Sequence, residues 1–598
     1  MASTSNTLIG GLVSYAITVA GDPIPGAAQV LSVYIETQVN RISTAKIVLS
    51  DGRADKGEFK ASSSDSFVPG AAVTISAGYD SRNALLFQGI ITRQSIRIDG
   101  LVGSTLEVEC RDAAIKMIVG RKCLTFSQQS DSDVISSIIG TYGLSDSVTP
   151  TNTVWPEQVQ YYVTDWDFIL SRAEINGMII TSLNGKVSVF APDADTTSVY
   201  TGGFGSGLME FNADLDAITQ LSSATATAWD YQNQEVNTGQ ASNSYAGPGN
   251  LSSSTLAKVA GLENYSMQTS APFQSVDLSN WAKAQLIKSA YSKIQGEAKF
   301  MGTNAINPGN YITLQGLGDR FSGNHIVSTV KHDISKGNWT TSVAIGLSPL
   351  WFIEEPDVMA PSASGLLPGA RGLFNGTVLK IFDDPLNQFR ILVKVPLFDA
   401  NGAGIWARLA NFYSTSNAGA FFMPEVGDEV VLGFLNEDPR SPVILGSMYS
   451  SSKLSPYKGL TPNEKNSTKA IVSKTGIAIK FDDENKVLTI VTPDNNTLIL
   501  SDKDKKITLQ DDNQNSVILS ADGIALKSPK DININADGKV NITGAQGVTV
   551  AASAGDVSIT GININETADS QYSAKGAETA TINSGMELTL KSAMIMIN

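Results

Sequence analysis

The sequence has few cysteines and no long apolar run. Its 598 residues include 2 cysteines, Cys110 and Cys123, too few for a disulfide-stapled secreted scaffold and without the paired CxxC spacing of a zinc site. No apolar run approaches the roughly 20 residues that span a bilayer as a helix. The N-terminus also lacks a basic segment followed by a long apolar stretch, so we expect cytoplasmic synthesis without a signal peptide.

Basic and aromatic residues are also scarce. Lys and Arg number 43 against 58 Asp and Glu, a net charge of −15, so the electrostatics of a nucleic-acid binder are missing. Glycine is abundant at 52 while Trp numbers only 7, which favours a β-rich, turn-dense architecture. The length exceeds what one hydrophobic core organises and predicts three or four domains.

The residues that carry most enzyme chemistry do not form a recognisable constellation. His325 and His332 are seven positions apart, without an HExxH pattern or a nearby acidic cluster. There is no GxSxG elbow, and a cysteine nucleophile would have to recruit one of these two histidines through the fold. The Gly-rich stretch 202–207 lacks the Lys of a P-loop and predicts a flexible loop. We therefore expect no catalytic residue, no metal site and no cofactor.

Paired carboxylates keep a carbohydrate-active alternative open. They occur at 383–384, 482–484 and 511–512, and glycosidases need two such groups flanking a bond. Adjacent acids in Asn-rich and Gly-rich turns are more often solvated turn residues. A second alternative is an OB-fold binding module. Such a module needs a basic or aromatic groove, and the sequence of this acidic chain does not indicate one.

The first part of the chain mixes short strands with helices. Alternating patterns predict strands at 71–79 and 105–112. Apolar residues at helical spacing predict one helix over 133–139 with Asp133 as its N-cap, and a second over 164–174. The segment 234–254 is rich in Asn, Ser, Gly and Gln, so we expect a surface loop there.

A composition break separates this part from the next. Residues 354–370 contain several prolines, glycines and small residues and predict a linker. The following 371–452 predict a small OB-type barrel of about five strands, and 453–470 a connector. The named strand candidates of the barrel are 376–381, 389–395, 429–434 and 442–446.

From residue 471 to residue 598 the sequence becomes a run of apolar-x-apolar triplets separated by polar or Gly-containing turns. Several successive triplets start eight residues apart. Each triplet places two aliphatic side chains on one face of a strand. The triplets are 507–509, 517–519, 524–526, 532–534, 540–542, 548–550, 557–559, 580–582, 588–590 and 595–597.

This repeat predicts a trimeric needle. Two aliphatic side chains per eight residues cannot enclose a core within one chain, and long unpaired strand edges invite aggregation. Three chains wound about a common axis would surround one dry interior and pair each edge with a neighbour. The alternative is a single-chain parallel β-helix, whose coils are usually longer and need more apolar residues per turn.

Three stretches together resemble the VgrG family of spike proteins. Residues 423–449 are similar to the family's P-x-V-G-D-E-V…F…D-P…P-V-I-x-G pattern, and 159–174, continued to 180, to the hub domain's signature. The third stretch is the terminal repeat. The resemblance implies a mainly β protein with an α+β hub over 1–353, built from tail-hub β-barrels with inserted helices. An OB-fold barrel and a C-terminal trimeric, triple-stranded β-helix needle would follow.

The same resemblance implies a mechanical function and its partners. A homotrimer would cap the inner tube of a contractile injection system, such as type VI secretion or a phage-like particle, and cross a membrane only by mechanical puncture. The hub would contact inner-tube and baseplate proteins, and effectors could travel as cargo. A PAAR-type tip protein would bind the distal end at Met594, Ile595, Met596, Ile597 and Asn598. We expect no enzymatic activity and assembly into a particle that is delivered outside the cell or into a target cell.

Overall fold

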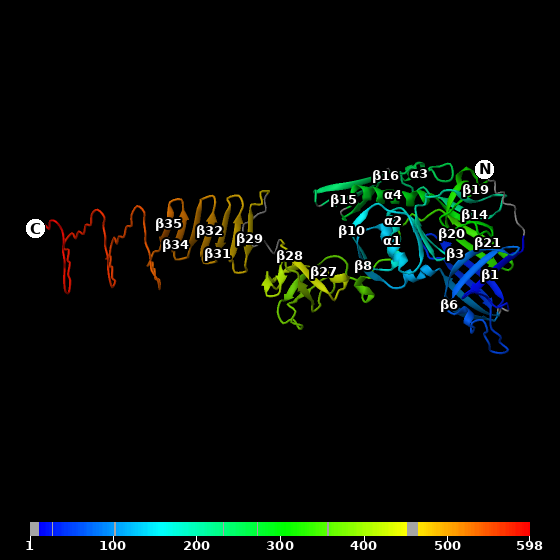
Figure 1. Cartoon of the computed structure of the whole chain (residues 1–598), viewed down its shortest axis with the longest axis horizontal. Helices are drawn as coiled ribbons and strands as arrows, with labels where there is room; N and C mark the ends of the chain where they lie inside the picture. Colours follow the sequence, from blue (N-terminus) through cyan, green and yellow to red (C-terminus); the bar gives the residue numbers. More distant parts are fainter. Residues whose placement is uncertain are drawn as a thin grey trace. The chain divides into compact units, whose positions relative to one another are not determined.

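The computed structural model describes residues 11–597, apart from 27, 101–102, 231, 263, 272, 356–357 and 451–463. The chain is mainly β and divides into two compact units, one ending at Met448 and one beginning at Tyr449. Figure 1 shows the chain with many of these elements labelled. Among the described helices, none combines the length and the apolar character that a bilayer crossing requires.

The hub is built on one large, mainly antiparallel sheet. β20 pairs with β3 on one side and β21 on the other, and so joins its two halves. β13 (Ser198–Gly203) and β19 (Tyr311–Gln315) pair beside β20. In spatial order the other strands are β14 (Leu208–Leu215), β18 (Ile294–Met301), β21 (Asn338–Ile345), β20 (Gly323–Ser335), β3 (Val30–Gln38), β4 (Thr44–Ser50), β7 (Gly103–Arg111), β6 (Arg82–Asp99), β5 (Ala72–Tyr79), β1 (Val13–Val19) and β2 (Asp22–Pro23).

The two strands predicted in this region are confirmed as β5 and β7. Their alternating sequences put every second side chain into a core, because the side-chain period of a strand is two. In β4 this period buries Ala45, Ile47 and Leu49 completely or nearly so. A second core gathers around Phe300 and Val327.

The two predicted helices are confirmed, with one correction. α1 (Asp131–Gly140) is capped by Ser130, whose hydroxyl accepts from the Asp133 amide at 3.2 Å. Asp133 was predicted as the N-cap, and that is wrong. Its carboxylate accepts from the Ser130 amide and completes a capping box. α2 (Asp165–Ile175) begins after Thr164, whose hydroxyl accepts from the Asp167 amide and caps the helix.

The prediction of a surface loop over 234–254 is wrong for its first half. β16 (Glu235–Ser242) pairs with β15 (Ser223–Asp230), which also pairs with β17 (Tyr265–Thr269). α4 (Ser275–Tyr291) packs against this sheet. At Gly239 an added Cβ would lie 2.2 Å from the Ser279 nitrogen. The small residues that suggested a loop are what lets the helix approach the strand.

The rest of the hub consists of short elements. β8 (Lys122–Ser130) and β10 (Val154–Val163) form a two-stranded ribbon. β9 (Ser145–Val148), β11 (Ile179–Leu183) and β12 (Lys186–Phe190) form a small sheet. The short helices are η1 (Asp65–Phe67), η2 (Ala113–Ile118), α3 (Ser253–Ala260), α5 (Gly318–Phe321), η3 (Phe352–Glu354), η4 (Ser362–Gly365) and, after the hub, η5 (Leu435–Glu437).

A closed five-stranded barrel follows, as the sequence predicts. Its core contains Ile391, Val393, Val430, Leu432 and Ile444, each fully buried. A short hairpin, β25 (Ser414–Thr415) with β26 (Ala418–Gly419), lies outside the barrel order. The barrel strands are β22 (Phe374–Lys380), β23 (Ile391–Lys394), β24 (Ile405–Leu409), β28 (Pro442–Ser447) and β27 (Glu429–Phe434).

The second unit is an antiparallel meander followed by an extended tail. Each strand pairs with the next along the chain. Most of the predicted connector, 453–463, lies outside the described residues. From 528 to 597 the chain is described but contains neither strand nor helix (Figure 1). The strands are β29 (Thr468–Val472), β30 (Ala478–Asp482), β31 (Val487–Val491), β32 (Thr497–Ser501), β33 (Lys506–Gln510), β34 (Ser516–Ser520) and β35 (Gly523–Lys527).

Candidate functional site

The aliphatic side chains of the repeat strands lack a cover within the chain. In β33, Ile507 and Leu509 are 41% and 54% exposed, while Thr508 between them is only 9% exposed. The same holds for other large apolar residues of the meander. Contiguous exposed apolar surface of this kind marks an interaction site in soluble proteins. The exposed members include Ile471, Phe481, Leu500, Leu519, Ile524 and Leu526.

The exposure is greater after Lys527. Here the aliphatic residues of the triplets are each more than half exposed, although they keep the spacing that would place them on one face of a strand. In this segment the backbone has no strand partner and the apolar side chains have no apolar cover. Both could be supplied by another chain. These residues are Ile532, Ile534, Val540, Ile542, Val548, Val550, Val557, Ile559, Ile582, Leu588 and Leu590.

The predicted tip site continues this surface to the end of the chain. Met594, Ile595, Met596 and Ile597 are consecutive and exposed, from 51% at Ile595 to 88% at Ile597. The fifth predicted residue, Asn598, lies outside the described residues. Four adjacent apolar side chains in water form an unstable end unless a partner covers them.

Both histidines are core residues of β20. His325 lies beside the Phe321 carbonyl, with Nε2 and the oxygen 2.7 Å apart, and burial lowers the pKa of its imidazole. His332 Nδ1 is 3.0 Å from Thr341 Oγ1, and burial lowers its pKa to about 4. A neutral, buried imidazole bonded to a hydroxyl or a carbonyl fits structural packing. Among the described residues, no His, Cys, Asp and Glu side chains gather as metal ligands would.

The cysteines and the Gly-rich stretch also have structural roles. Cys110 is buried in the β-sheet core, and burial raises the pKa of its thiol to about 12, far from that of a nucleophile. Cys123 is exposed on β8. The stretch 202–207 is a hydrogen-bonded turn between β13 and β14, with the Gly203 and Ser206 backbones joined by two bonds of 2.8 and 2.9 Å. This ordered turn replaces the flexible loop that was predicted.

The carboxylate pairs organise turns. Asp384 is held by Arg390, 2.6 Å away, and accepts the Gln388 amide at 2.7 Å. The Arg390 hydrogen bonds, together with backbone amides, hold the pKa of the Asp384 carboxyl well below its usual range. Its neighbour Asp383 pairs separately with Lys380. Asp482 and Asp511 likewise accept from Asn485 and Asn515 within their own turns. These contacts give Asp383, Asp384, Asp482 and Asp511 a structural explanation.

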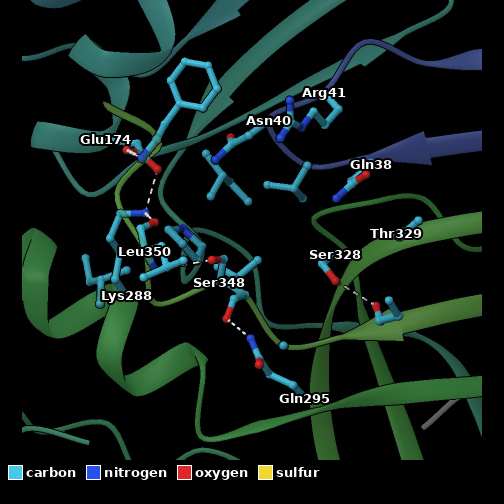
Figure 2. Close-up of a pocket in the computed structure, with 18 of the residues that line it drawn as sticks. Gln38, Asn40, Arg41, Glu174, Lys288, Gln295, Ser328, Thr329, Ser348 and Leu350 are labelled. Carbon is cyan, nitrogen blue, oxygen red and sulfur yellow. Dashed lines mark hydrogen bonds and ion pairs between the residues drawn. The ribbon is translucent and has the colours of Figure 1, made fainter. Parts of the chain in front are cut away.

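A cavity of about 750 Å³ lies where α2, α4, β3, β20 and β21 meet (Figure 2). Lys288 Nζ is 2.6 Å from Glu174 Oε1 and donates to the Leu350 carbonyl at 2.7 Å. Glu174 also accepts the Phe352 amide at 2.8 Å. At the rim, Arg41 pairs with Glu355 at 2.9 Å. These charges hold residues 350–355 against the hub.

The sequence contained no local signal for this cavity. Its lining residues come from segments between Gln38 and Glu355 that the fold brings together. No spacing within one segment predicts such a meeting. The apolar triplets, by contrast, were visible in the sequence because each is complete within three residues.

Two family models match the chain. The model of the Alg8 N-terminal domain matches residues 10–336, more than half of the chain. The model of the type VI secretion system/phage-baseplate injector OB domain matches residues 374–449. The second match spans the closed barrel β22–β28.

Curated relatives are spike proteins. The type VI secretion system spike protein VgrG1c of Pseudomonas aeruginosa is 22% identical over 424 residues, which cover 66% of this chain and 57% of the relative. VgrG3 of Vibrio cholerae is 38% identical over 63 residues, covering 10% of this chain and 6% of the relative. The matched regions thus span little more than half, or much less, of these relatives.

Solved structures of low identity are also similar. A 43 kDa tail protein of prophage MuSo2 from Shewanella oneidensis matches 56% of this chain and 98% of its own, with 10% identity and a TM-score of 0.44. A component of the type VI secretion system from E. coli matches 72% of this chain and 99% of its own, with 12% identity and a TM-score of 0.35. The injector OB-domain model and the VgrG relatives carry the assignment, and residues 10–336 match the Alg8 N-terminal domain model: the chain belongs to the VgrG and phage tail-spike family.

Proposed function

We propose that three copies of this chain form the spike of a contractile injection system, with residues 471–598 wound about a common axis as a needle. The observation that carries this proposal is the apolar face of the repeat, whose aliphatic side chains stay exposed in one chain from β29 to Ile597. Threefold symmetry would bring three such faces together and remove them from water. The family's spike proteins support the same reading.

The remaining parts have mechanical roles in this proposal. The hub over 1–353 docks on the inner tube and the baseplate, and 354–370 links it to the OB domain over 371–452. The connector over 453–470 leads into the needle. Three chains paired at every strand edge give a stiff shaft that transmits the force of contraction. The spike works without catalysis in this scheme.

The distal end binds a tip protein. Three copies of Met594, Ile595, Met596 and Ile597 form an apolar platform, and these residues together with Asn598 bind a small PAAR-type protein that caps the end. The exposure of the four described residues supports this assignment. Effectors travel as cargo on the spike or its tip.

Delivery follows from assembly. In this proposal the chain joins the particle inside the cell and leaves when contraction drives the tube outward. It crosses the target envelope by mechanical puncture. The type VI secretion spike proteins among its relatives support this route.

Light scattering tests the needle. The full chain should have a mass near three times 63.3 kDa, because the needle holds the trimer together. A chain ending near residue 460 retains the hub and OB cores but loses the apolar face, so its mass should fall towards that of a monomer on dilution. A stable full-length monomer would contradict the trimeric spike.

A further inference from the structure

Two loops meet where the hub joins the OB barrel, and both have strained backbones. Ala363 and Ser364 in η4 have φ values of 49° and 57°, and Asn436 and Glu437 in η5 have 52° and 58°. Left-handed backbone is unfavourable for most residues with a Cβ, such as Ala363, Ser364 and Glu437, although Asn adopts it more readily. Such conformations persist only where surrounding contacts hold them, and they gather at switches and clamps. Four in two facing loops call for an explanation.

The contacts that hold the loops centre on one carboxylate. Glu437 accepts from Arg371 Nε at 3.0 Å and from the Ser362 hydroxyl. Arg371 Nη2 also donates to Ser362 Oγ at 2.9 Å, so the three side chains are hydrogen-bonded to one another. The Ser362 hydrogen bond, assisted by Arg371, lowers the pKa of the Glu437 carboxyl, so it is charged at neutral pH. Charge-assisted bonds of this kind are the strong ones.

Two further bonds fasten the same loops. Asn436 Nδ2 donates to Ser364 Oγ at 3.0 Å, so two strained residues hold each other. The Ala370 amide donates to the Glu437 carbonyl at 2.7 Å. On the hub side, Tyr161 of β10 reaches Asn436 with a long bond of 3.5 Å. The joint is therefore fastened by polar contacts.

The same joint is poorly packed. A cavity of about 730 Å³ lies between β10, α2, Ile353, residues 358–362 and η5. Its apolar walls include Val159, Tyr161 and Met359, each about 60% exposed. Protein interiors are normally close-packed, and a large packed interface is what keeps two domains from moving. Between the hub and the OB barrel, a few hydrogen bonds and an ion pair take the place of a large packed interface.

We propose that η4, η5 and Arg371 form a releasable latch between hub and OB barrel. In the closed state, seen here, the Glu437 network holds both strained loops and fixes the barrel against the hub. When the network breaks, the strained residues relax and the barrel turns on the segment 359–373. The latch would let the spike adjust the angle between hub and barrel as it docks on its partners. It operates within one chain and does not require the trimer.

Hydrogen exchange of the full-length chain tests the latch. In Glu437→Gln, peptides over 359–373, which include the Ala370 amide, should exchange about 10-fold faster or more, because a charge-assisted network is lost. The matched control is Asp438→Asn, which removes the next carboxylate. Asp438 pairs with Arg440 within the same loop, 2.7 Å away, and in the described part of the chain it forms no hydrogen bond with residues 362–371.

The two variants separate the possible outcomes. Faster exchange in Glu437→Gln alone, with β27 and β28 amides still protected, supports the latch. Exchange over 359–373 that matches the unmodified chain, or that rises equally in Asp438→Asn, overturns it. Because light scattering reports the trimer separately, a failed latch and a failed needle give different results.

Discussion

In the hub sheet, Ile47, Leu49 and Leu106 are fully buried within one chain, whereas Ile524, Ile542 and Ile582 of the repeat are more than 70% exposed. Both regions alternate aliphatic and polar residues along short strands. The difference lies in what each face meets. Hub strands come from distant parts of the sequence and close a core, while each repeat strand meets only its neighbours along the chain.

The repeat also contains two parts that differ in which of their groups are covered within the chain. From β29 to β35 the backbone pairs within the chain, and only the side chains lack cover. From 528 to 597 the backbone forms no described strand either. Unsatisfied backbone groups and exposed aliphatics both favour association. In the proposed trimer, the strands β29 to β35 could form before the three chains assemble. Residues 528–597 would form strands only when the chains assemble.

Equivalent substitutions in the two regions should give the largest contrast. Ile47→Asp places an unpaired carboxylate in the hub core, and we expect a loss of about 4 kcal/mol or more in the free energy of unfolding. Ile542→Asp, its matched partner in the repeat, should leave the hub folded and weaken only the trimer. Urea unfolding monitored by tryptophan fluorescence and light scattering separate the two effects. A hub that unfolds equally in both variants would remove the contrast.

Acid should act on the hub before it acts on the repeat. Both histidines lie in β20, and the pKa of His332 is lowered to about 4 by burial. Between the ordinary pKa of 6.5 and about 4 the unfolded chain takes up this proton and the folded chain does not. The free energy of unfolding therefore falls as pH decreases through this range, by about 3 kcal/mol near pH 4.

Urea midpoints at pH 7 and pH 4.5 measure this dependence. His332→Gln, which keeps a polar group near Thr341, should have a shallower pH dependence than the unmodified chain. An unchanged slope would show that His332 does not couple hub stability to pH. The repeat contains no histidine, so its association should not share this component.

The smallest expected effect is a difference in thiol reactivity between the two cysteines of the hub. A thiol reagent at neutral pH should modify the exposed Cys123 quickly and leave Cys110 unreacted, because Cys110 is buried and the pKa of its thiol is raised to about 12. Cys123→Ser should abolish the fast reaction, and urea should expose Cys110. Two fast thiols per native chain would mean that the sheet core opens readily.

Local signals predicted several elements well. β5, β27 and the helix α2 could be found because a few adjacent residues contain the whole pattern. β16 was missed because its small polar residues become a strand only when β15 and α4 flank them. The Glu174–Lys288 pair and the Glu437–Arg371 pair join residues more than 60 positions apart. No regular spacing of residues in the sequence predicts such pairs.

The sequence by itself determined the mainly β class, the five-stranded barrel and the repeated apolar triplets, because periodicity and turn residues act over a few positions. Only the tertiary structure decided which aliphatic side chains are covered, that both histidines and Cys110 belong to a core, and that strained loops meet at the hub–barrel joint. Burial and strain depend on what the rest of the chain brings to each residue. That arrangement is a property of the whole fold.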